Sequence, residues 1–195
     1  MNVENIGSGR KAINRYKNVS WIPYNLTEYL FENENIWKLL YYSTNDALSK
    51  PNLTRQEKIN LIWRGQDRQE DYRVFLTPMQ ENAQPEQACV LRIFVHRVAP
   101  VNPVYADILI GIEMLCQTKL GMLDDGRPRI EVLFEEIMGT ILDKNIQGVG
   151  NVFFSQGQGG NTSCASYMQV GNKRDYFDRL TVVATHFAGY GETQC

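Results

Sequence analysis

Two long runs of alternating apolar and polar residues, Ala88 to Val98 and Tyr105 to Lys119, constrain the fold more than any other part of this sequence. Alternation with a period of two predicts β-strands with one buried face and one solvent-facing face. Pro100 and Pro103 lie between the runs and cannot donate to a strand ladder, so they mark a loop. Together the runs predict a long antiparallel hairpin. Its apolar face would carry Cys89, Leu91, Ile93, Val95, Ile108, Ile110, Ile112, Met114 and Cys116, and its polar face Arg92, His96 and Glu113.

A strongly amphipathic segment follows the hairpin. Leu123 to Pro128 has the composition of a turn, and proline is tolerated at the first position of a helix. From Pro128 to Asn145 the apolar residues recur at spacings of three and one, which predicts a helix with one apolar stripe. Such a helix needs an apolar sheet face to cover, and the hairpin supplies one. The stripe consists of Ile130, Leu133, Phe134, Ile137, Met138, Ile141 and Leu142.

The first third of the chain is expected to be helical. Residues 25–42 carry spaced apolar residues, with a break or bend expected at Asn33-Glu34-Asn35. Thr54 and Glu57 form a capping-box pattern, which predicts a short helix that Gly65 stops. Residues 1–24 are expected to be a flexible or partner-ordered arm.

Shorter strands are expected on either side of the hairpin and helix. They are Arg73 to Thr77, Val152 to Phe154, Ser166 to Val170 and Tyr176 to Phe187. The predicted fold class is therefore α+β: N-terminal helices, a mainly antiparallel sheet with a long hairpin, and one amphipathic helix packed on the sheet. Residues 25–188 would form a single domain, and residues 189–195 a C-terminal tail.

The residues that most often carry chemistry give no recognisable catalytic motif. Gly7 to Lys11 lacks the spacing of a phosphate loop, and His96 and His186 have no second ligand at metal-binding spacing within their strands. Glu135 and Glu136 point about 100° apart on a helix, so they cannot jointly flank a substrate. We therefore expect no catalytic, cofactor-binding or metal-ligating residues and no enzymatic activity.

Charge and apolar content limit the possible partners. The formal net charge is −2, whereas a chain whose whole surface binds nucleic acid would be basic. Lys173, Arg174 and Arg179 leave only a local basic cluster, suited to nucleic acid, an acidic partner subunit or solvent. No apolar run reaches the roughly 18 residues that a transmembrane helix needs, and the N-terminus lacks the apolar core of a signal peptide, so no membrane partner is expected. The four cysteines are expected to be reduced thiols.

The order of elements, ending in the strand Tyr176-Phe177-Asp178-Arg179-Leu180-Thr181-Val182-Val183-Ala184-Thr185, resembles the tail-terminator and tail-completion proteins of tailed bacteriophages and the related head–tail joining proteins of the neck. The resemblance covers about Asn25 to Phe187 and rests on topology and strand pattern. The extra N-terminal stretch through Gly65 and the two prolines of the hairpin loop depart from the simplest members.

The resemblance implies a structural virion protein, assembled in the cytoplasm of the host bacterium. It would form a homo-oligomeric ring, a hexamer in the common case, that completes the tail and joins it to the head connector. Its partners would be copies of itself and neighbouring neck, connector or tail-tube proteins, and DNA would pass through the channel without sequence-specific binding. Another structural or adaptor module, or an enzyme with an unrecognised site, stays an alternative. The interface candidates are Arg73, Phe75, Arg92, His96, Glu113, Lys173, Arg174 and Arg179.

Overall fold

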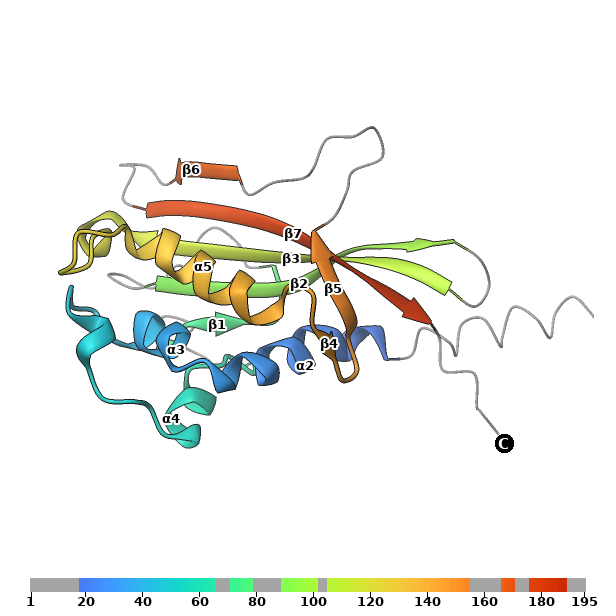
Figure 1. Ribbon diagram of the computed structural model, residues 1–195, viewed down its shortest axis with the longest axis horizontal. Coiled ribbons are helices and arrows are strands. Elements are labelled where there is room, and N and C mark those ends of the chain that lie inside the picture. The colour runs from blue at the N-terminus through green and yellow to red at the C-terminus, as the bar shows by residue number, and fades with distance from the viewer. Residues whose placement is uncertain are drawn as a thin grey trace, which may run out of the picture.

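The chain has an α+β fold in which helices pack on one face of a sheet (Figure 1). The computed structural model describes residues 18–65, 71–78, 89–101, 105–154, 166–170 and 176–188. The predicted tail of residues 189–195 and residues 1–17 of the predicted arm lie outside these ranges. The predicted fold class is confirmed.

The described elements follow the predicted order. They are α2 (Ile22–Tyr29), α3 (Glu34–Tyr41), α4 (Arg55–Asn60), β1 (Val74–Phe75), β2 (Cys89–Pro100), β3 (Tyr105–Gln117), α5 (Arg129–Ile141), β4 (Asn145–Ile146), β5 (Gly150–Phe154), β6 (Ser166–Val170) and β7 (Tyr176–Ala188). Short 3-10 turns lie at Val19–Trp21, Leu30–Glu32, Ala47–Ser49 and Thr118–Leu120.

The sheet is built around the hairpin. Its strand order is β1-β2-β3-β7-β5-β4, and β6 also pairs with β7. β2 and β3 are antiparallel as predicted, β7 pairs antiparallel with β3 along its whole length, and β1 is parallel to β2. The ladder of β2 continues to Pro100, opposite Ala106, although the proline was predicted to end it earlier. Proline is compatible with the last position of a strand, where its missing N–H leaves no gap within the ladder.

The N-terminal helices begin before the predicted boundary. A 3-10 turn leads directly into α2 at Ile22, so residues 22–24 are helical and not part of an arm. Pro23 suits this start, because the N–H that it lacks would have no helical partner in the first turn. Ile22 is fully buried, and this burial fixes the start of α2 against the rest of the domain.

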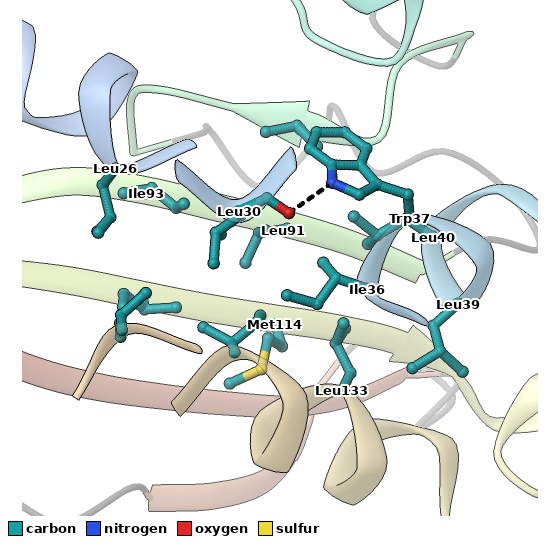
Figure 2. Packing of buried hydrophobic residues seen from close by; sticks show 14 of the residues in the cluster. Leu26, Leu30, Ile36, Trp37, Leu39, Leu40, Leu91, Ile93, Met114 and Leu133 are labelled. Carbon is teal, nitrogen blue, oxygen red and sulfur yellow. Dashed lines mark hydrogen bonds between the residues drawn. The ribbon is translucent and has the colours of Figure 1, made fainter. Parts of the chain in front are cut away.

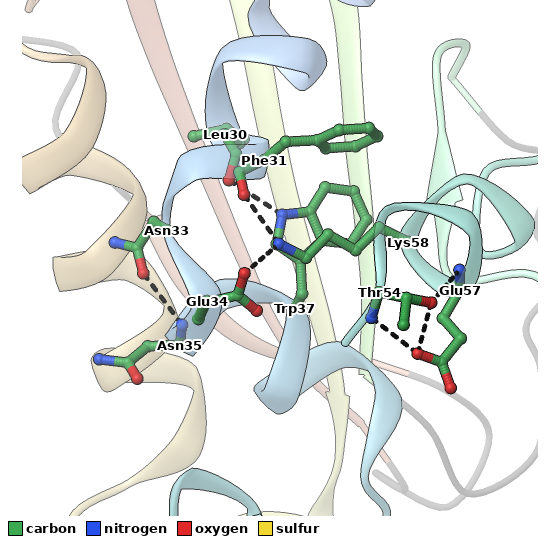
Figure 3. Close-up of polar contacts among 9 residues, drawn as sticks. All are labelled: Leu30, Phe31, Asn33, Glu34, Asn35, Trp37, Thr54, Glu57 and Lys58. Carbon is green, nitrogen blue, oxygen red and sulfur yellow. Dashed lines mark hydrogen bonds and ion pairs between the residues drawn. The ribbon is translucent and has the colours of Figure 1, made fainter. Parts of the chain in front are cut away.

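The predicted bend between α2 and α3 lies at Asn33, which has extended backbone and caps α3. Its Oδ1 accepts a hydrogen bond from the N–H of Asn35 at 3.0 Å (Figure 3). Its Nδ2 donates to Glu136 Oε2 on α5 at 2.8 Å. The residue that starts α3 therefore also ties it to α5.

The predicted capping box of α4 is confirmed, whereas the predicted length of α5 is not. The capping box is present: the Thr54 hydroxyl accepts from the N–H of Glu57, and the Glu57 carboxylate accepts from the N–H of Thr54 (Figure 3). Helix α4 ends at Asn60, before Gly65. Helix α5 is shorter than predicted, because Pro128 is its N-cap and Asp143 has a positive φ of 58°, which helical residues do not adopt.

The apolar core lies between the sheet and helices α2, α3 and α5 (Figure 2). Trp37 of α3 is fully buried, and its Nε1 donates to the carbonyl oxygen of Leu30 at 2.9 Å, so its polar atom is satisfied. Each fully buried large apolar side chain contributes about 1.5–3 kcal/mol relative to an exposed one. The side chains around it include Leu26, Ile36, Leu39, Leu40, Leu91, Ile93, Met114 and Leu133.

Two buried cations join the helical layer internally. Lys58 of α4 donates to the carbonyl oxygen of Phe31 at 2.8 Å and pairs with Glu34 of α3 (Figure 3). Arg129, at the start of α5, is fully buried and donates to backbone carbonyls in the last turn of α3, in the segment that follows α3 and in the turn after β3. Those acceptors are the carbonyl oxygens of Leu39, Tyr42, Thr44 and Leu120.

The opposite face of the hairpin was predicted to face solvent. This is wrong for the first half of β2, from Val90 to Phe94. Val90, Arg92 and Phe94 are 1%, 6% and 9% exposed. Neighbouring strands and the residues around β1 cover them: Trp63 and Tyr72 pack against the cluster that contains Val90. Alternation along one strand did not reveal this cover, because it comes from residues distant in sequence.

Candidate subunit interface

The side of the sheet that faces away from α2, α3 and α5 is here called the helix-free face. The strand register defines its members, because residues directly opposite in paired strands point to the same side. They are Phe75 of β1, Val90, Arg92 and Phe94 of β2, Leu109, Gly111, Glu113 and Leu115 of β3, and Asp178, Leu180 and Val182 of β7.

Three charged side chains meet on this face. Arg92 lies directly opposite Glu113 across the hairpin, and its Nη1 is 2.8 Å from Glu113 Oε2. Arg92 Nε, Arg92 Nη2 and Asp178 Oδ1 are buried and have no hydrogen-bond partner among the described residues. A buried polar group without a partner costs about 1–3 kcal/mol. The cluster therefore has unused donors and one unused acceptor.

Asp178 is the member of this cluster whose charge depends on pH near neutrality. The pKa of its carboxyl group is raised to about 6. Burial is the largest cause, repulsion from the neighbouring Glu113 carboxylate adds to it, and Arg92 opposes the shift. A hydrogen bond with Glu113 also favours the protonated form.

Apolar side chains surround the charged cluster. Phe75, Val90 and Leu115 form a small separate core with exposed fractions of 0–1%. The far end of the Phe94 ring lies over Gly111, where an added Cβ would come within 2.6 Å of the ring. Leu180 and Val182 are half-buried. The helix-free face therefore combines a buried apolar cluster, half-buried aliphatic side chains at Leu180 and Val182, and an incompletely satisfied charge cluster.

The outer edge of β2 is open beyond its short pairing with β1. β1 pairs only with Leu91 and Arg92, so from Ile93 onward the edge has no strand partner among the described residues. The register shifts between Val95 and Arg97, which leaves His96 in a bulge. Figure 1 shows the end of the hairpin projecting beyond α3 and α5. An open edge presents backbone donors and acceptors that a further strand can pair with.

The structure brings only some of the predicted interface residues together. Arg92 and Glu113 form the centre of the charge cluster, and His96 is exposed at the bulge. Arg73 is half-buried, burial lowers the pKa of its guanidinium, and its Nη1 donates to the carbonyl oxygen of Tyr72. Lys173 and Arg174 lie outside the described residues.

Two predicted interface residues have internal roles instead. Phe75 is completely buried, because β1 is flanked by Trp63 and Tyr72 and not exposed as a free edge. Arg179 lies on the helix-covered face, where it pairs with Glu131 of α5 and its guanidinium stacks 3.6 Å from the centre of the Phe134 ring. Neighbouring positions of a strand point to opposite faces, so Arg179 turns inward while Asp178 turns outward.

Asp178 and Phe94 are the site residues that sequence reasoning missed. Asp178 appeared only as part of a strand pattern, and its nearness to Glu113 follows from the pairing of β3 with β7. Its signal in the sequence is a carboxylate on the side of a strand that also carries Leu180 and Val182. That pattern indicates a partly buried acid, but it does not identify the neighbour.

The described residues offer two further observations on the site. No group of three or more His, Cys, Asp or Glu residues among them is placed to hold a metal ion. Within the same part of the chain, no helix has the length and apolar character needed to cross a membrane.

Comparison with known proteins places the chain in a family. The YomW family model matches residues 33–173, which include all of the hairpin and α5. The chain therefore belongs to the YomW family, which is phage-derived, and is a phage-associated protein. No curated protein and no solved structure matches it significantly.

Proposed function

We propose that this member of the YomW family is a structural virion protein that assembles into a homo-oligomeric ring at the phage neck or tail end. There it would complete the tail and join it to the head connector. Two things support the proposal: the phage-derived family, and the resemblance of the element order to tail-completion and head–tail joining proteins. The helix-free face supplies the physical reason for assembly.

The observation that carries the proposal is the state of Arg92. Its side chain is buried, yet Nε and Nη2 have no acceptor among the described residues. A buried arginine is tolerated when acceptors satisfy its donors. In the proposed ring, a neighbouring copy packs against the half-buried part of this face, at Leu180 and Val182, and contributes acceptors to the charge cluster beside it.

The open edge of β2 offers a second surface through which one copy can contact the next. Pairing between this edge and a strand elsewhere on the next copy joins two different surfaces, and repetition of one heterologous contact closes a ring when the rotation permits. Val98, 36% exposed, and Val101, 58% exposed, lie at the end of the hairpin and add apolar area. The ring would be non-enzymatic, and a net charge of −2 per copy would let DNA pass without tight binding.

The test is the mass and location of the assembly. The full-length chain would be measured by native mass spectrometry and negative-stain imaging over a wide concentration range, alone and with the neck and tail-tube proteins of its phage. We expect a closed ring with one stoichiometry, located by labelled antibody at the neck or tail end of the particle. A chain that stays monomeric with all these partners, or that labels elsewhere, would contradict the proposal.

A further inference from the structure

A groove of about 880 Å³ lies away from the helix-free face, between the exposed side of α2 and the turn that joins β4 to β5. Trp21 and Tyr29 supply aromatic surface, Glu28 and Glu32 supply carboxylates, and Gln147 lies on the opposite wall. Trp21 is 57% exposed, an unusual state for tryptophan in a domain that buries Trp37 completely. The groove is therefore an exposed aromatic and acidic surface that the ring contacts described above do not use.

The two walls of the groove are held together. Asn25 Nδ2 of α2 donates to the carbonyl oxygen of Gly148 at 3.3 Å. Gly148 has a positive φ of 74°, and a Cβ at this position would come within 2.3 Å of Asn25 Nδ2. The positive φ favours glycine here, and the hydrogen bond to its carbonyl oxygen joins α2 to the turn between β4 and β5.

Two carboxylates, Glu28 and Glu32, and one guanidinium, Arg55, line the groove, so its net charge is negative. Glu28 pairs with Arg55 at 2.9 Å, whereas Glu32 has no cationic partner in the described part of the chain. Its ideal ligand is a segment with basic side chains that meet Glu32 and apolar side chains that cover Trp21 and Tyr29.

Residues 1–17 of the chain have this composition. They contain Arg10, Lys11, Arg15 and Lys17 against a single acidic residue, Glu4. Ile13 and Tyr16 alternate with these basic positions and supply apolar surface. We infer that the groove is a docking site for residues 1–17 of a neighbouring copy of this chain. This inference rests on the proposed self-assembly and names a second contact within it.

The position of Asn18 favours a neighbouring copy over the same copy. Asn18 lines the groove itself, so residues 1–17 join the domain at the groove's own wall. To lie in its own groove, the segment would have to reverse direction immediately before α2. The segment of a neighbouring copy enters without that reversal, as in the exchange of identical elements between subunits.

Trp21 provides a direct readout in the full-length chain. Trp37 is fully buried and Trp63 half-buried, so acrylamide quenching of tryptophan fluorescence reports mainly on Trp21. We expect quenching to fall as the protein concentration rises through the range in which mass measurements show assembly. The Trp21→Phe variant should lose this concentration-dependent part of the signal.

Reversing the charges of the groove and of residues 1–17, singly and together, tests whether these residues are the groove's ligand. Glu32→Lys should raise the midpoint concentration of Trp21 protection about fivefold, because it turns an exposed attraction into a repulsion. Glu135→Lys, the same change on an exposed residue of α5, should leave the midpoint unchanged. Adding Arg10→Glu and Lys11→Glu to the Glu32→Lys chain should restore protection.

Each remaining outcome would overturn the inference in a recognisable way. Rings that form while Trp21 stays equally accessible would refute the groove contact and leave the proposed ring intact. Protection that is already complete in the diluted monomer would show that the segment docks in its own copy. A chain that is monomeric at every concentration would refute the proposed function as well, and the mass measurement identifies that case.

Discussion

The two arginines that are buried among the described residues, Arg129 and Arg92, lie on opposite faces of one sheet and have different surroundings. Arg129 is 0% exposed and Arg92 is 6% exposed, so bulk solvent has little access to either side chain. Arg129 donates to four backbone carbonyls from the segments around α3 and β3. Arg92 has one carboxylate partner, Glu113, and two nitrogens without an acceptor in the described residues.

The difference is whether the guanidinium donors have acceptors within the described part of the chain: those of Arg129 do, and two nitrogens of Arg92 do not. Carbonyls at the end of a helix and in loops have no helical donors of their own, so Arg129 satisfies acceptors that would otherwise be buried unpaired. It thereby holds α3, α5 and the turn after β3 in one arrangement. Arg92 has no comparable set of acceptors among the described residues. Its unsatisfied donors are the physical reason to propose the helix-free face as the assembly interface.

The largest effect is expected from Arg129→Met. The substitution leaves four carbonyls without their donor, and we expect the free energy of unfolding to fall by about 3–5 kcal/mol. Urea denaturation at neutral pH measures the loss. Arg129→Lys keeps the charge but not the planar fork, so its loss should be smaller yet clear. A loss below about 1 kcal/mol for Arg129→Met would remove the contrast between the two arginines.

A smaller effect on stability, with a large effect on assembly, is expected from Arg92→Met. The unassembled chain should lose about 1–3 kcal/mol, because Glu113 loses its cationic partner but its side chain stays partly open to solvent. Ring formation, followed by native mass spectrometry, should be abolished or strongly weakened. Arg127→Met, which removes an exposed arginine paired with Asp125, is the matched control and should assemble normally. Normal assembly of Arg92→Met would contradict the interface assignment.

Periodicity predicted the elements well because it reflects which side of each element is buried. The alternation of β2 and β3, the bend at Asn33 and the capping box at Thr54 all depend on neighbouring residues, and the structure contains each of them. Helix α5 was predicted as an element, but its end depends on Asp143, whose left-handed backbone has no strong signature in a side chain of this type.

The site could be predicted only in part, because register between distant strands decides it. Arg92 and Glu113 were both identified, since a hairpin of known length nearly fixes their pairing. Asp178 joins them only through the pairing of β3 with β7, more than 60 residues along the chain. Arg129 escaped notice because a charged residue beside a proline resembles a solvated turn, and its four acceptors come from tertiary contacts.

The smallest effect, and the one that most sharpens the comparison, is expected from Asp178→Asn. The pKa of Asp178 rises from its usual 3.8 in the unfolded chain to about 6 in the folded chain, so the folded chain holds a proton that the unfolded chain releases. The free energy of unfolding should therefore fall as pH rises from about 4 to about 6, and stay lower above that range. The variant has a neutral amide at this position at every pH. Above pH 6 it should be more stable than the natural chain by about 1 kcal/mol, after allowance for solvent screening of a half-buried group.

Urea denaturation of both chains at several pH values measures the difference, and the difference should vanish below about pH 4, where both forms are neutral at this position. Parallel curves across the whole range would show that Asp178 is not perturbed by Glu113 and burial. The fully satisfied surroundings of Arg129 contain no carboxylate among the described hydrogen-bond partners, so no comparable pH-dependent step is expected from them. A pH-dependent change in stability that Asp178→Asn removes would show that the charge cluster of the helix-free face is incompletely satisfied in the single chain. The proposed interface requires such a cluster, because a neighbouring copy would complete it.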